Sequence, residues 1–267
     1  MSADEVFVTV AAMIVGPLLW AVWFFQIFRL QRVPGRRRSG AGIIGLALAA
    51  SIAAILFVLT TSASFDVVDA PIYQFMYVVL GLAWLRVSGA VFTFLGVSLR
   101  DDVVERGNRA AAIAVAGALL GVAFCYAGGN IGDGPGWWVV IFAAGFATAT
   151  LFAAWMLLTR LTPIVDAVTI DRDAAAGLRS AAFLAGCGLV LGRGVAGDWF
   201  SAIETISDFL AALPPVAVIT AIAAIVERAA RPTADRPHAP LVAFGVLPSL
   251  AYLGAAIAAL SIVRWPE

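Results

Sequence analysis

The sequence has no lysine, one histidine and two cysteines, and only 13% of its residues carry a formal charge. Without lysine the chain cannot form a retinal Schiff base, although 267 residues would suit a seven-helix photoreceptor. His238 alone cannot supply the paired axial ligands of transmembrane haems, and with two cysteines it does not favour a zinc site. Cys125 and Cys187 lie in apolar runs outside any CxxC pair, so they are interpreted as small buried hydrophobic residues. We therefore expect no cofactor and no metal site.

The chain also lacks the common catalytic signatures. It contains no GxxxxGKS or GxxxxGKT phosphate loop, no GxSxG elbow and no HExxH zinc motif. Its formal net charge of zero argues against nucleic acid as a partner. We expect no enzymatic activity and no catalytic residue.

What the chain does contain is apolar sequence. Hydrophobic residues make up 62% of it and its mean hydropathy is +0.98, whereas soluble domains are about 45–50% apolar. A helix needs roughly 20 apolar residues to cross a bilayer core of about 30 Å. Eight segments qualify, and they predict an all-α integral membrane protein with a single transmembrane domain over residues 1–267. The segments are 6–28, 41–62, 72–97, 110–127, 137–159, 175–195, 205–226 and 240–262.

The arginines predict the orientation of these segments. Fourteen of the 17 fall in the loops after the first, third, fifth and seventh segments or just inside the sixth, and two fall on the opposite side. Cytoplasmic loops of membrane proteins are enriched in positive charge. We therefore expect the arginine-rich loops in the cytoplasm and both termini outside.

The same loops recur at a regular spacing of roughly 65 residues, which suggests an internal repeat. The best-matching pair lies around residues 105–121 and 170–186. The spacing predicts four degenerate two-helix repeats in the same orientation.

Two stretches resemble a known family. Residues 105–121, ERGNRAAAIAVAGALLG, resemble the first motif of the YjfL-like family of small bacterial inner-membrane proteins. Residues 171–177, DRDAAAG, followed by LAGCG at 184–188, resemble its second motif, with Asp173 where the family usually has asparagine. The resemblance covers about residues 72–199. It implies a multi-pass protein of the bacterial inner membrane with a domain of unknown function, tandem two-helix repeats and no established catalytic residues. It also implies a genomic context of envelope-stress, ion-channel or polyamine-synthesis genes.

Three residues form a candidate polar site within the membrane. Arg86 lies near the middle of the third segment, where an arginine should face protein or water. It could contact an anion or substrate in a polar cavity or act as a gate charge. Alternatively, it could be a structural residue bonded to carbonyls and Ser88, or the span could be shifted so that Arg86 lies shallower. Pro214 and Pro215 must interrupt the hydrogen bonds of the seventh segment. That interruption could build an ion or substrate site or could be a simple kink.

Polar residues precede the fourth and sixth segments. The carboxylates could hold a divalent cation or a polyamine, or they could complement the helix dipoles and be neutralised by neighbouring arginines. Asn108 and Asp173 each suit the N-cap position of the segment that follows. Asn108 could instead line a pore or contact a lipid headgroup. The candidate caps and cytoplasmic carboxylates are Asn108, Asp173, Asp101, Asp102, Glu105 and Asp171.

Two pairs of glycines have the spacing of helix-packing motifs. Gly117 and Gly121, like Gly188 and Gly192, are four residues apart. Such pairs let helix backbones approach closely in lipid. We expect them to pack helices together within the bundle or across a subunit interface.

Two functions remain open from the sequence. The first is a non-enzymatic assembly or envelope-stress module that associates with itself or with a membrane-protein partner in the bilayer, as a homo-oligomer or a complex. The alternative is a channel or transporter for a small ion or solute, with Arg86 in a polar cavity.

Overall fold

The computed structural model describes residues 1–31, 40–230 and 240–263, and every regular element in these ranges is a helix. Eight helical stretches are long and apolar enough to cross a membrane, so the expected all-α membrane fold is confirmed. They are Ala3–Arg29, Ala41–Thr61, Pro71–Phe94, Arg109–Gly128, Trp137–Leu161, Ala174–Gly194, Ala202–Ala229 and Leu241–Ile262.

Five of these spans are single α-helices, and the other three are composite. The single helices are α3 (Ala41–Thr61), α5 (Pro71–Phe94), α6 (Arg109–Gly128), α7 (Trp137–Leu161) and α9 (Ala174–Gly194). The composite spans are α1 (Ala3–Met13), η1 (Ile14–Leu18) and α2 (Leu19–Gln31); α10 (Ala202–Phe209), η3 (Leu210–Ala212) and α11 (Leu213–Ala229); and η4 (Leu241–Val246) with α12 (Leu247–Ile262). Three short elements lie in the connections: α4 (Phe65–Val68), η2 (Leu99–Glu105) and α8 (Ile164–Thr169).

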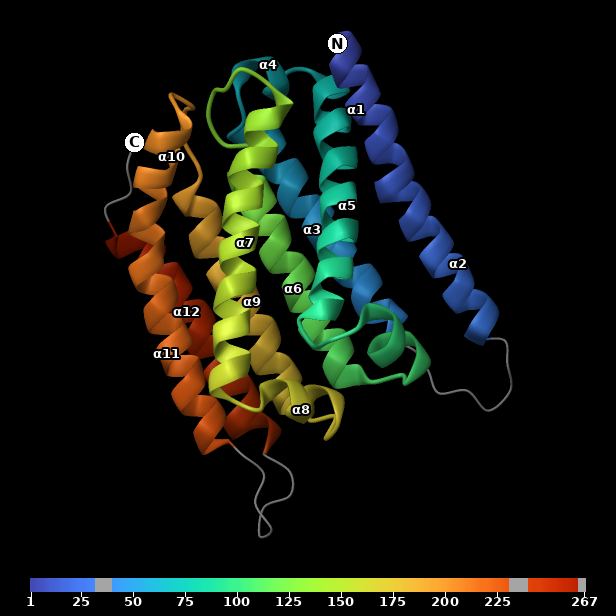
Figure 1. The fold of residues 1–267 in the computed structure, drawn as a ribbon, viewed down its shortest axis with the longest axis vertical. Coiled ribbons are helices and arrows are strands. Elements are labelled where there is room, and N and C mark those ends of the chain that lie inside the picture. Colours follow the sequence, from blue (N-terminus) through green and yellow to red (C-terminus); the bar gives the residue numbers. More distant parts are fainter. Residues whose placement is uncertain (32–39, 231–239, 264–267) are drawn as a thin grey trace.

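The even-numbered spans form a row through the molecule. Helix α3 packs against α6, α6 against α9, and α9 against α12, and the odd-numbered spans lie along this row (Figure 1). Helices α6 and α9 are the most enclosed of the spans. In the most apolar 18 residues of each, 83% and 78% of the residues are buried. The core therefore lies around the two helices on which the sequence motifs were found.

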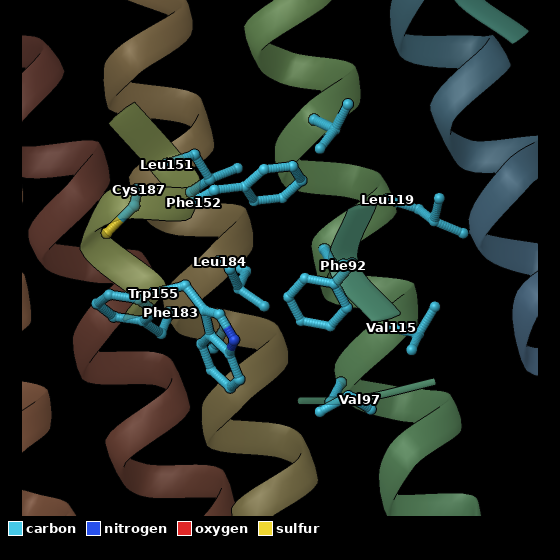
Figure 2. Packing of buried hydrophobic residues seen from close by; sticks show 14 of the residues in the cluster. Phe92, Val97, Val115, Leu119, Leu151, Phe152, Trp155, Phe183, Leu184 and Cys187 are labelled. Carbon is cyan, nitrogen blue, oxygen red and sulfur yellow. The ribbon is translucent and has the colours of Figure 1, made fainter. Parts of the chain in front are cut away.

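Aromatic side chains fill the space between α5, α7 and α9 (Figure 2). The rings of Phe92 and Trp155 have centroids 5.5 Å apart, and those of Trp155 and Phe183 are 6.5 Å apart. The indole nitrogen of Trp155 donates to the carbonyl of Leu95, 3.2 Å away. This bond satisfies one of the carbonyl groups left free where α5 ends.

The observed ends of the spans differ from the predicted ones by three residues or fewer. The third span ends at Phe94 and not at residue 97, because Gly96 takes a φ of +106° and turns the chain out of the helix. The arginines at 32, 36, 37, 38, 231 and 236 lie outside the described residues. The orientation of the bundle in a membrane stays a prediction.

Candidate functional site

Arg86 lies closer to one end of the membrane than the sequence suggests. It is eight residues before Phe94, the last residue of α5, and fifteen after Pro71. At 1.5 Å per residue this puts it about 12 Å from the end that continues into η2. Its side chain is half-buried. The side chain is thus accessible from the end of the bundle that the arginine distribution assigns to the cytoplasm.

The guanidinium of Arg86 is only partly satisfied by its neighbours. Its Nε is buried and has no hydrogen-bond partner among the described residues. Its Cζ lies 5.8 Å from the centroid of the Trp20 ring, a cation–π contact. Trp20 is itself fixed by its indole nitrogen, which donates to the carbonyl of Leu82 at 3.2 Å. A guanidinium within a membrane-spanning helix is unfavourable without polar partners, so this geometry favours an anion or water beside Arg86.

Arg86 faces an open groove of about 1120 Å³ between α2, α5 and η2, called the α2–α5 groove below. Among the described residues, three arginines line it, Arg29, Arg86 and Arg100, and one acidic residue, Glu105. Glu105 is paired with Arg100, with 3.1 Å between Oε1 and Nε. The groove therefore carries an excess of positive charge within otherwise apolar walls.

Pro214 and Pro215 lie elsewhere. They occupy the first turn of α11, after the 3-10 turn η3. Proline is tolerated in a first helical turn because the N–H it lacks has no helical partner there. Helix α11 packs on α7, α9 and α12, whereas the groove is lined by α2, α5 and η2. The structure does not bring the two prolines together with Arg86.

Asn108 and Asp173 cap the helices that follow them. The Asn108 Oδ1 accepts the N–H groups of Ala110 and Ala111 at 3.0 and 3.2 Å. Asp173 accepts the equivalent two N–H groups of α9 at the same distances. The Asn108 amide also donates to the Val168 carbonyl at 2.8 Å, which a carboxylate cannot do. Asn108 thus joins the two connections in addition to capping α6.

The remaining carboxylates make local bonds. Asp102 is 5% exposed and accepts from the Ser98 N–H at 2.8 Å and from Arg106 at 2.9 Å. Asp101 accepts from the Ser98 hydroxyl, and Asp171 is exposed. Among the described residues no group of three or more His, Cys, Asp or Glu side chains is placed to hold a metal ion.

The two connections that precede α6 and α9 have matching backbones. Each has a residue of left-handed conformation two positions before the helix begins, Gly107 with φ 58° and Arg172 with φ 56°. The hydrogen bonds around them correspond at a shift of 65 residues. They are Arg106 N–H to Asp101 O and Asn108 N–H to Asp102 O, against Asp171 N–H to Asp166 O and Asp173 N–H to Ala167 O. These bonds agree with a two-unit repeat of that period, and the four-fold repeat stays a prediction.

The glycine pairs lie in the contact between α6 and α9. A Cβ atom built on Gly121 would lie 2.3 Å from the Leu184 carbonyl oxygen, and one on Gly188 would lie 2.3 Å from the Gly121 oxygen. Gly117 and Gly192 meet backbone of the opposite helix in the same way. Of the two sequence interpretations, the geometry is that of packing inside the bundle.

A buried ion pair joins the sixth and seventh spans, and the sequence analysis did not identify it. Arg179 on α9 and Glu227 on α11 are 2% and 4% exposed and form two hydrogen bonds, one of them 2.8 Å from Nη2 to Oε2. Arg179 also donates to the Phe244 carbonyl in η4. The hydroxyl of Tyr252 is buried and has no partner among the described residues. The sequence signal for this pair is weak: Arg179 lies just inside the predicted sixth span, and Glu227 lies one residue after the predicted seventh, at the same end.

A smaller cavity of about 200 Å³ lies at the other end of the bundle. Its lining includes Glu5, Asp66 and Asp133 together with Tyr73 and Tyr77. No arginine is among the described residues that line it. The two ends of the bundle thus present cavities of opposite charge.

Comparison with known proteins adds one match. Residues 66–195 match the family model described as Domain of Unknown Function (DUF350). No curated protein and no solved structure matches the chain at a significant level. The match includes α5, η2, α6, α7, α8 and α9, and therefore Arg86, both capped connections and the glycine contact. The chain is a multi-pass membrane protein that carries a DUF350 domain over residues 66–195.

Proposed function

We propose that the protein is a non-enzymatic assembly module of the bacterial inner membrane, which associates with itself or with a membrane-protein partner of the envelope. The observation that carries this proposal is the exposure of the last span. In the most apolar 18 residues of the η4–α12 span, only 17% of the residues are buried, whereas 83% are buried in the corresponding part of α6. This span lies at one end of the helix row, where one side of it has no neighbour among the described helices (Figure 1).

The exposed face of α12 has the composition of a helix-packing surface. Ala251, Gly254 and Ala258 are exposed and fall at helical spacings of three and four residues. A Cβ atom on Gly254 would meet nothing within 4 Å, so this glycine serves no contact within the described chain. Small residues on a lipid-facing surface allow two helix backbones to approach closely. This supports a contact with a second membrane helix at α12.

The experiment compares the size of the assembly for the wild type and for Gly254→Leu in lipid nanodiscs or mild detergent. We expect the wild type to have a mass that is a multiple of its 27.8 kDa chain and the variant to shift toward the single chain. Ala149→Leu, at an exposed position of α7, is the matched control and should leave the mass unchanged. A wild type that is a single chain in lipid, and that co-purifies with no membrane partner, would contradict the proposal.

A second candidate is a channel or transporter for a small ion or solute. The unpartnered Nε of Arg86 beside the α2–α5 groove supports it, since charged groups within spans often mark permeation pathways. The test is flux of protons, K⁺, chloride and spermidine through purified protein in liposomes. Selective flux that Arg86→Leu abolishes without loss of folding would favour transport over assembly alone.

A further inference from the structure

We propose that the α2–α5 groove is a binding site for an anionic phospholipid, whose phosphate is held by the groove arginines and whose acyl chains lie against its apolar walls. This inference does not rest on the proposed assembly. It starts from three properties of the groove: its charge, an arginine with no ion-pair partner among the described residues, and its place along two membrane-spanning helices.

Positive charge exceeds negative charge in the groove, both at the ends of the helices and deeper, at the level of Arg86. At the ends of the helices, Arg29 and Arg100 face one carboxylate, Glu105, which Arg100 already binds. Deeper, Arg86 forms no ion pair with any described residue, and its Nε has no hydrogen-bond partner. Three guanidiniums and one carboxylate leave a net charge of +2 in the groove. A phosphate supplies both the missing charge and the hydrogen-bond acceptors, since guanidinium and phosphate match in a bidentate geometry.

The walls of the groove favour a lipid over a free anion. Trp23, Ile27 and Leu99 are buried at its base, and Phe94 at its edge is 88% exposed. The groove lies along two membrane-spanning helices, α2 and α5, so its apolar edge faces acyl chains. An inorganic anion would gain nothing from these contacts, whereas burial of apolar acyl surface adds to lipid binding in proportion to the area covered.

The position of the groove also fits a lipid headgroup. Arg29 is near the end of its span, and Arg100 and Glu105 lie in η2 directly after α5. Charged residues at the ends of spans lie at headgroup depth. Arg86 extends the basic surface inward from that level, and its guanidinium contacts the ring of Trp20 on α2 at 5.8 Å. The anionic lipid would come from the leaflet on the arginine-rich side.

The experiment measures the binding of phosphatidylglycerol and of phosphatidylcholine to the purified full-length chain, for example by native mass spectrometry of lipid titrations. We expect the wild type to prefer phosphatidylglycerol and Arg86→Gln to lose about tenfold or more of that affinity, as for a charge-assisted bond. Arg160→Gln removes an exposed arginine at the end of α7 and is the matched control. It should bind phosphatidylglycerol as the wild type does.

A second variant keeps the charge and fills the space. Ala90 is an exposed lining residue, so Ala90→Trp should reduce phosphatidylglycerol binding while leaving the fold intact. Ala153→Trp, at an exposed position of α7, is its control. Equal affinity for the two lipids, or wild-type phosphatidylglycerol binding by both Arg86→Gln and Ala90→Trp, would overturn the proposal. The proposal would also be overturned if soluble glycerol phosphate raised the unfolding temperature of the protein as much as phosphatidylglycerol does. That result would assign the groove to a free anion.

Discussion

At the scale of single residues, two of the arginines in the spans, Arg86 and Arg179, have opposite surroundings. Arg179 is enclosed by Glu227 and a backbone carbonyl, and it is 2% exposed. Arg86 faces a groove with its Nε unpartnered. The loss of either partner of a buried ion pair is strongly unfavourable, because it leaves the other charge buried without a counter-charge. The Arg86 side chain is half-buried and has no ion-pair partner among the described residues, so its charge, although not its buried Nε, is available to a ligand in the groove.

The ion pair gives a prediction about stability. Glu227→Leu should lower the free energy of unfolding by about 3–5 kcal/mol, because it leaves the Arg179 guanidinium buried without a counter-charge. The double variant Arg179→Met/Glu227→Leu should recover most of that loss, since an apolar pair of similar volume replaces the charges. Thermal or denaturant unfolding of the purified protein in detergent measures both. A single variant as stable as the wild type would show that the pair is not structural.

At the scale of elements, the contact between α6 and α9 organises the fold. Glycines and alanines bring the two backbones together, and Asn108 links the connections at one end of the pair. Because the helices are so close, each is buried by the other and by the outer spans. This contact lies within the DUF350 match, so the shared part of the domain contains its most tightly packed element pair.

The close approach predicts a strong effect at Gly121. A leucine there would collide with the Leu184 carbonyl oxygen, which lies 2.3 Å from the position of the new Cβ. This oxygen belongs to the backbone of α9, so the helix itself would have to move to relieve the collision. We expect a loss of about 1–3 kcal/mol or more in unfolding free energy. Gly42→Leu is the control, because a Cβ at Gly42 meets nothing within 4 Å. Similar unfolding midpoints for the two variants would contradict the prediction.

Which of these features the sequence could predict depends on how local they are. Spans depend on runs of apolar residues, and caps depend on one side chain and the helix directly after it. The sequence could predict the eight spans and the capping position of Asn108 for that reason. The pair of Arg179 and Glu227 joins residues 48 apart, and the α2–α5 groove joins three elements. Neither leaves a local pattern, because both depend on which helices the bundle places side by side.

At the scale of the whole molecule, the two ends of the bundle differ in charge. The larger groove is lined by three arginines, and the smaller cavity at the other end is lined by acidic residues and tyrosines. The described connections that contain η2 and α8, with Arg100, Arg106 and Arg172, are at the same end as the groove (Figure 1). The positive-inside rule assigns that end to the cytoplasm, so the groove should open to the cytoplasmic leaflet and the acidic cavity to the outside.

Cysteine labelling tests this orientation with little background, because Cys125 and Cys187 are both buried. Gly134→Cys lies in an exposed connection at the acidic end, and Asp171→Cys lies in an exposed connection at the arginine-rich end. A membrane-impermeant maleimide should label the first in spheroplasts and the second only after the membrane is opened. The wild type is the control and should stay unlabelled in both states. The reverse pattern would invert the bundle and would place the α2–α5 groove in the outer leaflet, where a lipid-binding role for Arg86 would have to be tested with the lipids of that leaflet.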